Sequence, residues 1–282
     1  MKNNDNYKLT IGWLYPELMS TYGDRGNIIS LQKRCEWRGI DVKILRLDFG
    51  FRISDLKACD MLFMGGAQDT QQTIVSKDLK EKKQVLREMI EDNIPGLYIC
   101  GAYQFLGKYY KEADGTIIEG LDILDLYTEN PGENAKRLIG NIVIELNNNI
   151  LRAKQGGVEK FSTSSNNTLI GFENHGGRTY LGKNVKALAT VKVGFGNNGT
   201  DKTEGAVYKN SFGTYLHGPI LPKNPHFADH LIKLALEKKY LPAMQDSKAL
   251  QAGKKTIQLK ELDDSLELQA HKHIAQGLGV TI

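Results

Sequence analysis

Short apolar runs alternate with amphipathic or turn-forming stretches over the first hundred residues of the chain. The runs at 8–15, 42–47, 61–64 and 97–99 have the length of buried strands. Between them, a helix is predicted over 28–37, where apolar residues recur at helical spacing, and a charged amphipathic helix over 77–91. This alternation predicts an α/β fold in which helices cover both faces of a mostly parallel central sheet.

The second half of the chain has shorter apolar segments and more turns. Strands are predicted at 140–146, 169–173, 186–193 and, with a break near residue 209, over 205–216. A helix is predicted over 226–239, and a last amphipathic segment over 262–274. No clear linker divides the chain. We therefore expect one domain over residues 1–240, followed by a helical C-terminal extension over residues 241–282.

Composition and charge narrow the class of protein without identifying it. The 282 residues are 40% apolar and 25% charged, as in ordinary globular domains, and the net charge of +4 is too small and too evenly spread to indicate nucleic-acid binding. The N-terminus is polar, and no apolar stretch approaches the ~18 residues of a membrane span. The three widely spaced cysteines show neither a disulfide framework nor a zinc pattern, so we expect a cytoplasmic protein without a metal.

Cys100 stands at the junction between a predicted strand and a predicted helix. The apolar run 97–99 precedes it, and Gly101 follows directly. At such a turn the helix amides favour a thiolate, and the sulfur is lifted to the end of the sheet where ligands collect. Cys100 is therefore a candidate nucleophile. The alternative is a buried cysteine that packs as a small hydrophobe.

His217 is the second candidate, 117 residues after Cys100 and at the end of another predicted strand. The turn signal Gly218-Pro219 follows it. A histidine at a strand end can act as the base for a cysteine that the fold brings near it. Alone, such a histidine is more often structural, and it is the combination with Cys100 that favours an enzyme.

Gly65 and Gly66 directly follow the predicted strand at 61–64. Glycines at this position let the backbone approach a ligand closely and point its amides inward. Together with the amide of Gly101 they would suit an oxyanion hole. The alternative is a turn that merely needs a positive φ. A phosphate loop is excluded, because no Gly-Lys-Ser/Thr follows.

Other polar side chains of chemical interest fall in predicted turns. Asp24 precedes the first helix, where it can cap the turn or orient a catalytic histidine. Arg137 lies where a loop enters a strand and could hold a substrate carboxylate through two hydrogen bonds, although most surface arginines are only solvated. The stretch 171–178 contains Glu173, Asn174 and His175, which would either position a substrate or belong to a polar hairpin. No second ligand at metal spacing lies nearby.

Taken together and in this order, the motifs resemble class I glutamine amidotransferases of the cobyric-acid-synthase-like type. More narrowly, they resemble the glutaminase subunits of lipid II isoglutaminyl synthases. The resemblance extends over roughly residues 8 to 240 and rests on segments 22–28, 65–69 with Gln72, 99–104, 171–179 and 213–221.

The resemblance implies roles for residues at matching positions. Cys100 would attack the side-chain amide of L-glutamine, and His217 would act first as general base and then as the acid that helps ammonia leave. The amides of Gly66 and Gly101 would stabilise the oxyanion. A glutamyl thioester on the cysteine would then be hydrolysed to glutamate.

Two further residues would bind the substrate, namely Arg137 and Gln104. The chain differs from many class I glutaminases in its third catalytic residue. Those enzymes carry a glutamate two residues after the histidine. Pro219 stands there in this sequence. The candidates for orienting the histidine are Asp24 and Glu173, unless no third residue exists.

The chain has no ATP-binding signature, so the resemblance implies a separate partner for the ATP-dependent step. That partner would be a MurT-like Mur ligase subunit that holds ATP and magnesium, in a heterodimer that needs no cofactor in the present chain. The ammonia would convert the D-glutamate of the lipid II stem peptide to D-isoglutamine in peptidoglycan synthesis, near the inner face of the membrane. Two alternatives stay open: a cobyrinate-type amidotransferase subunit, and a non-catalytic amidotransferase-like binding module.

Overall fold

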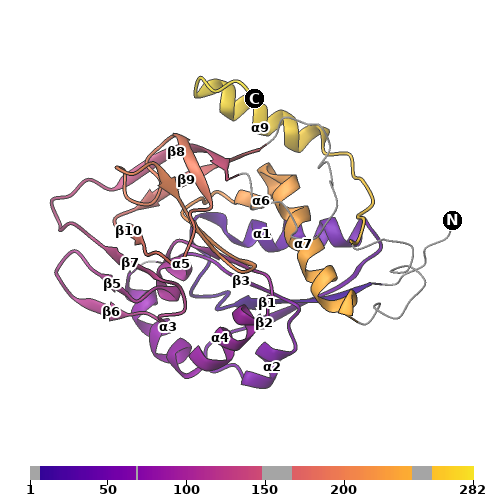
Figure 1. The fold of residues 1–282 in the computed structure, drawn as a ribbon, viewed down its shortest axis with the longest axis horizontal. Coiled ribbons are helices and arrows are strands. Elements are labelled where there is room, and N and C mark those ends of the chain that lie inside the picture. The colour runs from indigo at the N-terminus through magenta and orange to yellow at the C-terminus, as the bar shows by residue number, and fades with distance from the viewer. Residues whose placement is uncertain (1–6, 68, 148–166, 243–255) are drawn as a thin grey trace.

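A six-stranded sheet forms the centre of the computed structural model, which describes residues 7–67, 69–147, 167–242 and 256–282 (Figure 1). The strand order is β13-β14-β4-β3-β1-β2. Five neighbouring strands run parallel, namely β2 (Asp41–Leu47), β1 (Lys8–Leu14), β3 (Met61–Met64), β4 (Gly96–Ile99) and β14 (Ser211–Thr214). At one edge, β13 (Ala206–Tyr208) is antiparallel to β14. The predicted mostly parallel sheet is confirmed.

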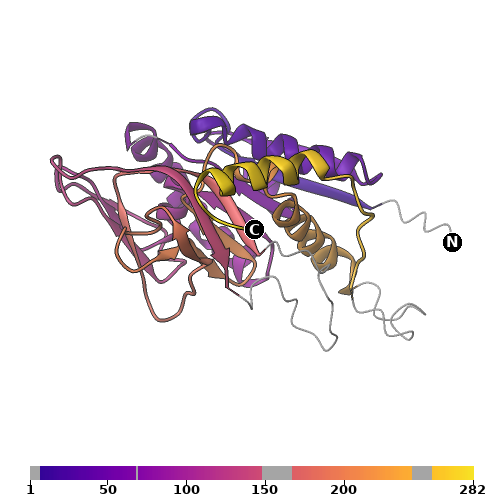
Figure 2. The same cartoon turned by 90° about the horizontal axis from the view of Figure 1, so that it is seen from above.

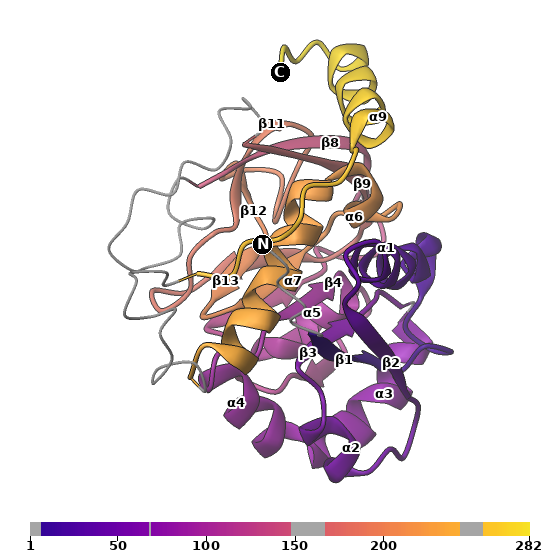
Figure 3. The same cartoon turned by 90° about the vertical axis from the view of Figure 1, so that its right-hand side faces the viewer.

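Helices cover both faces of this sheet, as Figures 1 and 3 show. One face carries three helices that contact one another, α1 (Arg25–Glu36), α6 (Ile220–Lys223) and α7 (Pro225–Tyr240). The other carries α2 (Ile53–Lys57), α3 (Asp69–Glu81) and α4 (Lys83–Glu91). The strands between these layers are buried along their whole length at β3 and β4, which explains why both are continuous apolar runs.

The prediction of a single helix over 77–91 is wrong, because two helices occupy this region. The first, α3, begins as early as Asp69, and the second, α4, starts at Lys83. Between them Lys82 is buried and donates to the equally buried Asp78 at 2.5 Å. The hydrogen bonds of this pair hold the chain at the junction, whereas a periodicity argument treats both charges as part of one exposed face.

Two four-stranded sheets lie beside the central one. The first has the order β10-β7-β5-β6 and consists of β5 (Tyr109–Lys111), β6 (Ile117–Glu119), β7 (Leu126–Glu129) and β10 (Arg178–Leu181). The second has the order β12-β11-β8-β9 and consists of β8 (Leu138–Leu146), β9 (Thr168–His175), β11 (Ala189–Val193) and β12 (Thr203–Glu204). The first sheet escapes prediction because its strands are short and each contains charged or polar residues, whereas the equally short β3 and β4 are continuous apolar runs.

The C-terminal part of the described chain ends in α9 (Ser265–Gly277), which packs against α6 and β9 (Figures 1 and 2). Arg34 of α1 connects this segment to α7: its buried guanidinium donates to Asp229 at 2.6 and 2.8 Å, and to Asp264 at 2.6 and 2.9 Å. On α9 itself, His271 is fully buried, and both ring nitrogens have a partner at 2.9 Å.

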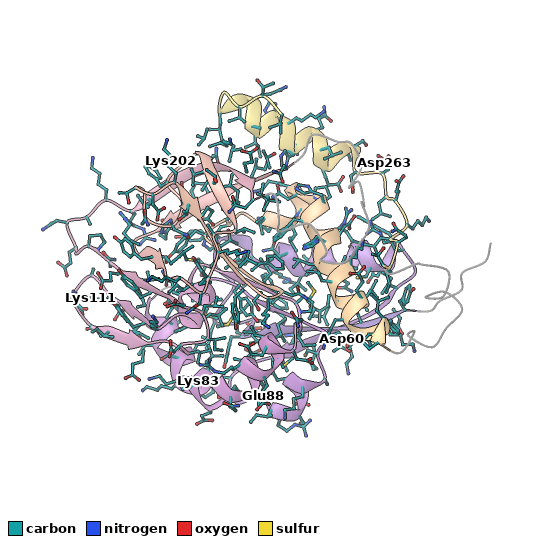
Figure 4. All side chains as sticks on the ribbon, viewed as in Figure 1. Asp60, Lys83, Glu88, Lys111, Lys202 and Asp263 are labelled. Carbon is teal, nitrogen blue, oxygen red and sulfur yellow. The ribbon has the colours of Figure 1, made fainter. Side chains whose placement is uncertain are left out.

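The charged side chains of Lys83, Glu88 and Lys202 lie at the periphery of the molecule (Figure 4). Within the described residues, none of the helices has the length and apolar character needed to cross a membrane.

Candidate active site

Cys100 occupies the sharp turn between β4 and α5 (Gly101–Leu106). Its backbone has φ 51° and ψ −107°, an uncommon conformation that costs a non-glycine residue on the order of 1–3 kcal/mol. The amide of Cys100 donates to the carbonyl of Thr214 at 2.8 Å, which fastens the turn to the neighbouring strand β14. A conformation of this kind, held by its surroundings, presents the sulfur at the carboxyl end of the sheet.

His217 reaches the same end of the sheet because it follows β14, the neighbour of β4. Its backbone pairs with Phe172 of β9 through hydrogen bonds of 2.8 and 3.1 Å. The ring is fully buried, and its Nδ1 lies 3.2 Å from Oδ1 of Asp24. Nε2 has no hydrogen-bond partner among the described residues and is therefore the nitrogen available to the thiol of Cys100.

Charge pairing raises the pKa of His217 to about 10. Burial by itself lowers this pKa, because apolar surroundings disfavour the charged ring, but the carboxylate of Asp24 and the sulfur of Cys100 outweigh that effect. At neutral pH, His217 is therefore a cation between two groups that can carry negative charge.

The carboxylate of Asp24 is held from two sides. Oδ1 faces His217, and Oδ2 accepts a hydrogen bond from the amide of Gly66 at 2.8 Å. The predicted role of Gly66 in an oxyanion hole is therefore wrong for this structure, because an amide has one hydrogen and Asp24 takes it. The glycine is needed for another reason: a Cβ at this position would lie 2.8 Å from Cε1 of His217 and 3.2 Å from Cβ of Cys100. Gln68, in the same motif, lies outside the described residues.

Glu173 does not contact His217, and its predicted orienting role is wrong. Its two carboxylate oxygens accept hydrogen bonds from the amides of Phe195 at 2.7 Å and Gly196 at 2.9 Å. Glu173 thus fixes the loop after β11. Within the described residues, no three His, Cys, Asp or Glu side chains cluster as a metal site would require.

A cavity of about 250 Å³ opens beside the cysteine and the histidine. This volume suits a small polar molecule rather than a large cofactor. The lining includes Gln104, whose side-chain nitrogen donates to the Tyr215 hydroxyl at 3.1 Å, and Arg137. The structure thus brings together five predicted residues, namely Asp24, Cys100, Gln104, Arg137 and His217, and leaves out Glu173.

Tyr22 lines the cavity and is missed by sequence reasoning as a site residue. Tyr22 packs its ring edge-on against His217, with the ring centroids 5.0 Å apart, and its backbone has φ 55°. His175, one of the polar residues that the sequence offers either for positioning a substrate or for a hairpin, also lines the cavity; its ring stacks on Tyr215 with the centroids 3.6 Å apart, and burial lowers its pKa. The only indication in the sequence for Tyr22 is that it is the first residue of the motif 22–28, which also contains Asp24.

The fold and the site define the class of protein. The model of the CobB/CobQ-like glutamine amidotransferase domain matches residues 10–225 of the chain, a span that includes Asp24, Cys100 and His217. The chain belongs to this family.

Curated relatives make the comparison more specific. The chain is 42% identical to the lipid II isoglutaminyl synthase (glutamine-hydrolyzing) subunit GatD of Staphylococcus aureus strain N315, over 94% of this chain and 93% of the relative. It is 41% identical to the GatD subunit of Streptococcus pneumoniae strain R6, over 86% and 88%. A probable cobyric acid synthase of Methanothermobacter thermautotrophicus is 30% identical over 73% of this chain, but only 38% of that relative is covered.

Proposed function

We propose that this chain is the glutaminase subunit of a lipid II isoglutaminyl synthase. The observation that carries the proposal is the arrangement of Cys100, His217 and Asp24 at one end of the sheet, beside a cavity of about 250 Å³. The chain is 42% and 41% identical in sequence to two GatD subunits over most of each chain, which supports the assignment to this particular synthase.

The reaction begins with attack of the Cys100 sulfur on the side-chain amide carbon of glutamine. A bond forms between sulfur and carbon, and the carbonyl oxygen becomes an oxyanion. His217, a cation at neutral pH, transfers a proton to the amide nitrogen, and ammonia leaves as the carbon–nitrogen bond breaks. The neutral ring then takes a proton from water, whose oxygen attacks the thioester carbon; the carbon–sulfur bond breaks, glutamate leaves, and the Cys100 thiolate is restored beside the protonated ring. Asp24 keeps Nδ1 protonated throughout, so that Nε2 exchanges the proton.

Backbone amides would stabilise the oxyanion. The amide of Gly101 is the first of α5, at the end of a helix where amides lack partners within the helix. Since Gly66 donates to Asp24, the second donor is the amide of Ala67, the next residue along the loop and part of the cavity lining.

Substrate binding falls to Arg137 and Gln104. Arg137 lies at the exposed rim of the cavity, where its guanidinium suits the α-carboxylate of an amino acid. Gln104 lies deeper, is 4% exposed, and can contact the polar end of the substrate.

The remaining assignments concern the wider system. Residues 1–240 would be the glutaminase domain and 241–282 its C-terminal extension, of which 243–255 lie outside the described residues. A MurT-like ligase with ATP and magnesium would use the ammonia to amidate the D-glutamate of lipid II, on the cytoplasmic side of the membrane. The cobyrinate-type alternative has weaker support, because the chain covers only 38% of the probable cobyric acid synthase.

The deciding experiment measures glutamate released from glutamine by the parent chain and by Cys100→Ala, each alone and with a MurT-like ligase. We expect release by the parent and none by the variant, while both bind the ligase equally. Cys35→Ala is the matched control, because Cys35 is a buried cysteine of α1 outside the cavity. Turnover retained by Cys100→Ala, or absent from the parent even with the ligase, would overturn the proposal.

A further inference from the structure

Asn174 connects two parts of the cavity rim that no other described hydrogen bond joins directly. It lies near the end of β9, and its side-chain oxygen accepts from Nε of Arg137 at 3.0 Å. Its side-chain nitrogen donates to the hydroxyl of Tyr22 at 2.9 Å. Since the ring of Tyr22 packs against His217, a continuous series of contacts runs from Arg137 to the catalytic imidazole.

The contacts of Asn174 determine which edge of the Arg137 guanidinium is free. Nε donates to the side chain of Asn174, and Nη2 donates to its backbone carbonyl at 3.1 Å. One hydrogen of Nη2 and both of Nη1 remain. Nη1 lies beside Gly176, where a Cβ would be 3.3 Å from it. The edge formed by Nη1 and Nη2 can therefore take a carboxylate through two parallel hydrogen bonds.

An amide is the side chain that this position requires. Asn174 accepts from the guanidinium with its oxygen and donates to the tyrosine hydroxyl with its nitrogen. An aspartate could accept from both Arg137 and the Tyr22 hydroxyl, but it would neutralise the charge of the guanidinium. The neutral amide orients Arg137 and leaves its positive charge for a ligand.

We propose that Asn174 is a positioning residue that makes the site selective for ligands carrying a carboxylate, by orienting Arg137; its hydrogen bond to Tyr22 holds the amide in the orientation that this role needs. The inference rests on the proposed glutaminase function and extends it. A substrate with an α-carboxylate uses the Asn174–Arg137 contact, whereas a small neutral reagent reaches the cysteine without it. Loss of Asn174 should thus affect the two kinds of ligand differently.

The test compares two reagents that alkylate Cys100 in the protein with its ligase partner. The glutamine analogue 6-diazo-5-oxo-L-norleucine carries a carboxylate, and iodoacetamide does not; labelling of the Cys100 peptide is followed by mass spectrometry. For Asn174→Ala we expect labelling by the analogue to slow about tenfold, as expected for a lost hydrogen bond to a charged group. The rate of labelling by iodoacetamide should stay within about twofold of the parent's rate, because the charge pairing between Cys100 and His217 is unchanged.

Three further variants sharpen the comparison. Asn174→Asp should slow the analogue at least as much as Asn174→Ala, because the new carboxylate competes for Arg137. Tyr22→Phe keeps the ring on His217 and removes only the hydroxyl, so we expect a smaller loss. Asn141→Ala is the matched control, because Asn141 is an exposed asparagine on β8 of the same sheet. In glutamine hydrolysis, Asn174→Ala should raise KM with little change in kcat.

The outcomes separate the inference from the function on which it rests. Equal slowing of both reagents in Asn174→Ala would show a merely structural role, and unchanged labelling by both would show no role; either result overturns the inference alone. A parent protein that hydrolyses no glutamine and does not react with the analogue would overturn the proposed function, and the inference with it.

Discussion

At the scale of single residues, the proposed chemistry depends on the charge of one buried histidine. Removing an imidazolium from water is unfavourable, and burial indeed lowers the pKa of His217 when considered alone. The carboxylate of Asp24, itself fully buried and fixed by the amide of Gly66, reverses the sign of the shift. Each of these groups is acceptable inside the protein only because the others are present.

The pH dependence of glutamine hydrolysis should report this pairing. The pKa of His217 is raised from 6.5 to about 10, so the ring keeps its proton across the neutral range and loses it as the pH rises through about 10. Because the protonated ring supplies the proton for the departing ammonia, kcat should decrease on the alkaline side of that value. Initial rates between neutral and alkaline pH check this expectation. An alkaline limb centred near the ordinary pKa of 6.5 would contradict it.

Asp24→Asn should remove the pairing without changing the size of the side chain. The amide of Gly66 still needs an acceptor, so the asparagine oxygen turns toward it and the NH2 group faces Nδ1 of the histidine. The ring would then hold its proton on the wrong nitrogen. We expect kcat to fall by at least about a hundredfold, a typical contribution of acid–base catalysis, and the alkaline limb to move to lower pH.

Glu173→Gln is the matched control for this experiment. It changes another buried carboxylate, one that binds the amides of Phe195 and Gly196 instead of the histidine. It should lower thermal stability and leave the alkaline limb in place. The role of Asp24 would be contradicted if Glu173→Gln moved the limb and Asp24→Asn did not.

At the scale of elements, adjacency of parallel strands assembles the site. The strands β3, β4 and β14 are neighbours, and their carboxyl ends lead into the Gly65–Gly66 loop, Cys100 and His217, respectively. The carboxyl ends of parallel strands meet at one edge of a sheet, where ligands bind. Gly66 of this loop must lack a side chain, because the side chains of three other residues come within a few ångströms of the place that a Cβ would occupy.

Gly66→Ala should inactivate the site while the fold persists. The added methyl would be 2.8 Å from Cε1 of His217, a distance that neither group can accommodate without moving. We expect glutaminase activity to drop at least about tenfold, since small displacements of catalytic groups cost up to about a hundredfold in rate. Circular dichroism and thermal unfolding should show a folded protein.

Gly277→Ala provides the control for the added methyl. Gly277 is the last residue of α9, and a Cβ there would contact nothing within 4 Å. Activity should equal that of the parent, and stability should stay the same or rise slightly, because alanine favours a helix over glycine. Full activity of Gly66→Ala would show that the loop does not approach the histidine as closely as described.

At the scale of the whole molecule, a buried ion-pair cluster fastens the C-terminal segment to the domain. The guanidinium of Arg34 binds Asp229 of α7 on one edge and Asp264, just before α9, on another. Burial alone would lower the pKa of Arg34, but the hydrogen bonds from both carboxylates raise it, so the arginine stays charged. The C-terminal segment is thus joined to the face of the sheet that carries α1 and α7.

Asp264→Ala should loosen α9 without affecting the glutaminase site. It leaves Arg34 half paired and removes the link between α1 and the start of α9. In hydrogen exchange followed by mass spectrometry, we expect amides of 265–277 to exchange at least about tenfold faster, a factor that corresponds to roughly 1.4 kcal/mol. Peptides from the central sheet should exchange as in the parent. Glu261→Ala, at an exposed glutamate of the same segment, is the control and should change little. Unchanged exchange in α9 would mean that the buried face around His271 suffices to hold it.

The sequence alone predicted the central sheet and singled out the two residues that are proposed to react. Buried strands such as β3 and β4 are continuous apolar runs, and parallel strands need helices between them, so local pattern and topology agree. Cys100 follows directly on β4 and His217 comes three residues after the end of β14, so each is placed by a strand of the central sheet. Local signals of this kind do not depend on the rest of the fold.

Only the tertiary structure decided which groups act on those residues. Asp24 and Glu173 are equivalent candidates in the sequence, and the choice between them depends on whether the turn before α1 or strand β9 presents its carboxylate to the histidine. The amide of Gly66 is taken by Asp24, and Asn174 meets Tyr22 across 152 residues of chain. Hydrogen bonds between distant segments arise from packing and leave no periodicity in the sequence, which is why the partners of the reacting residues, and not the residues themselves, required the structure.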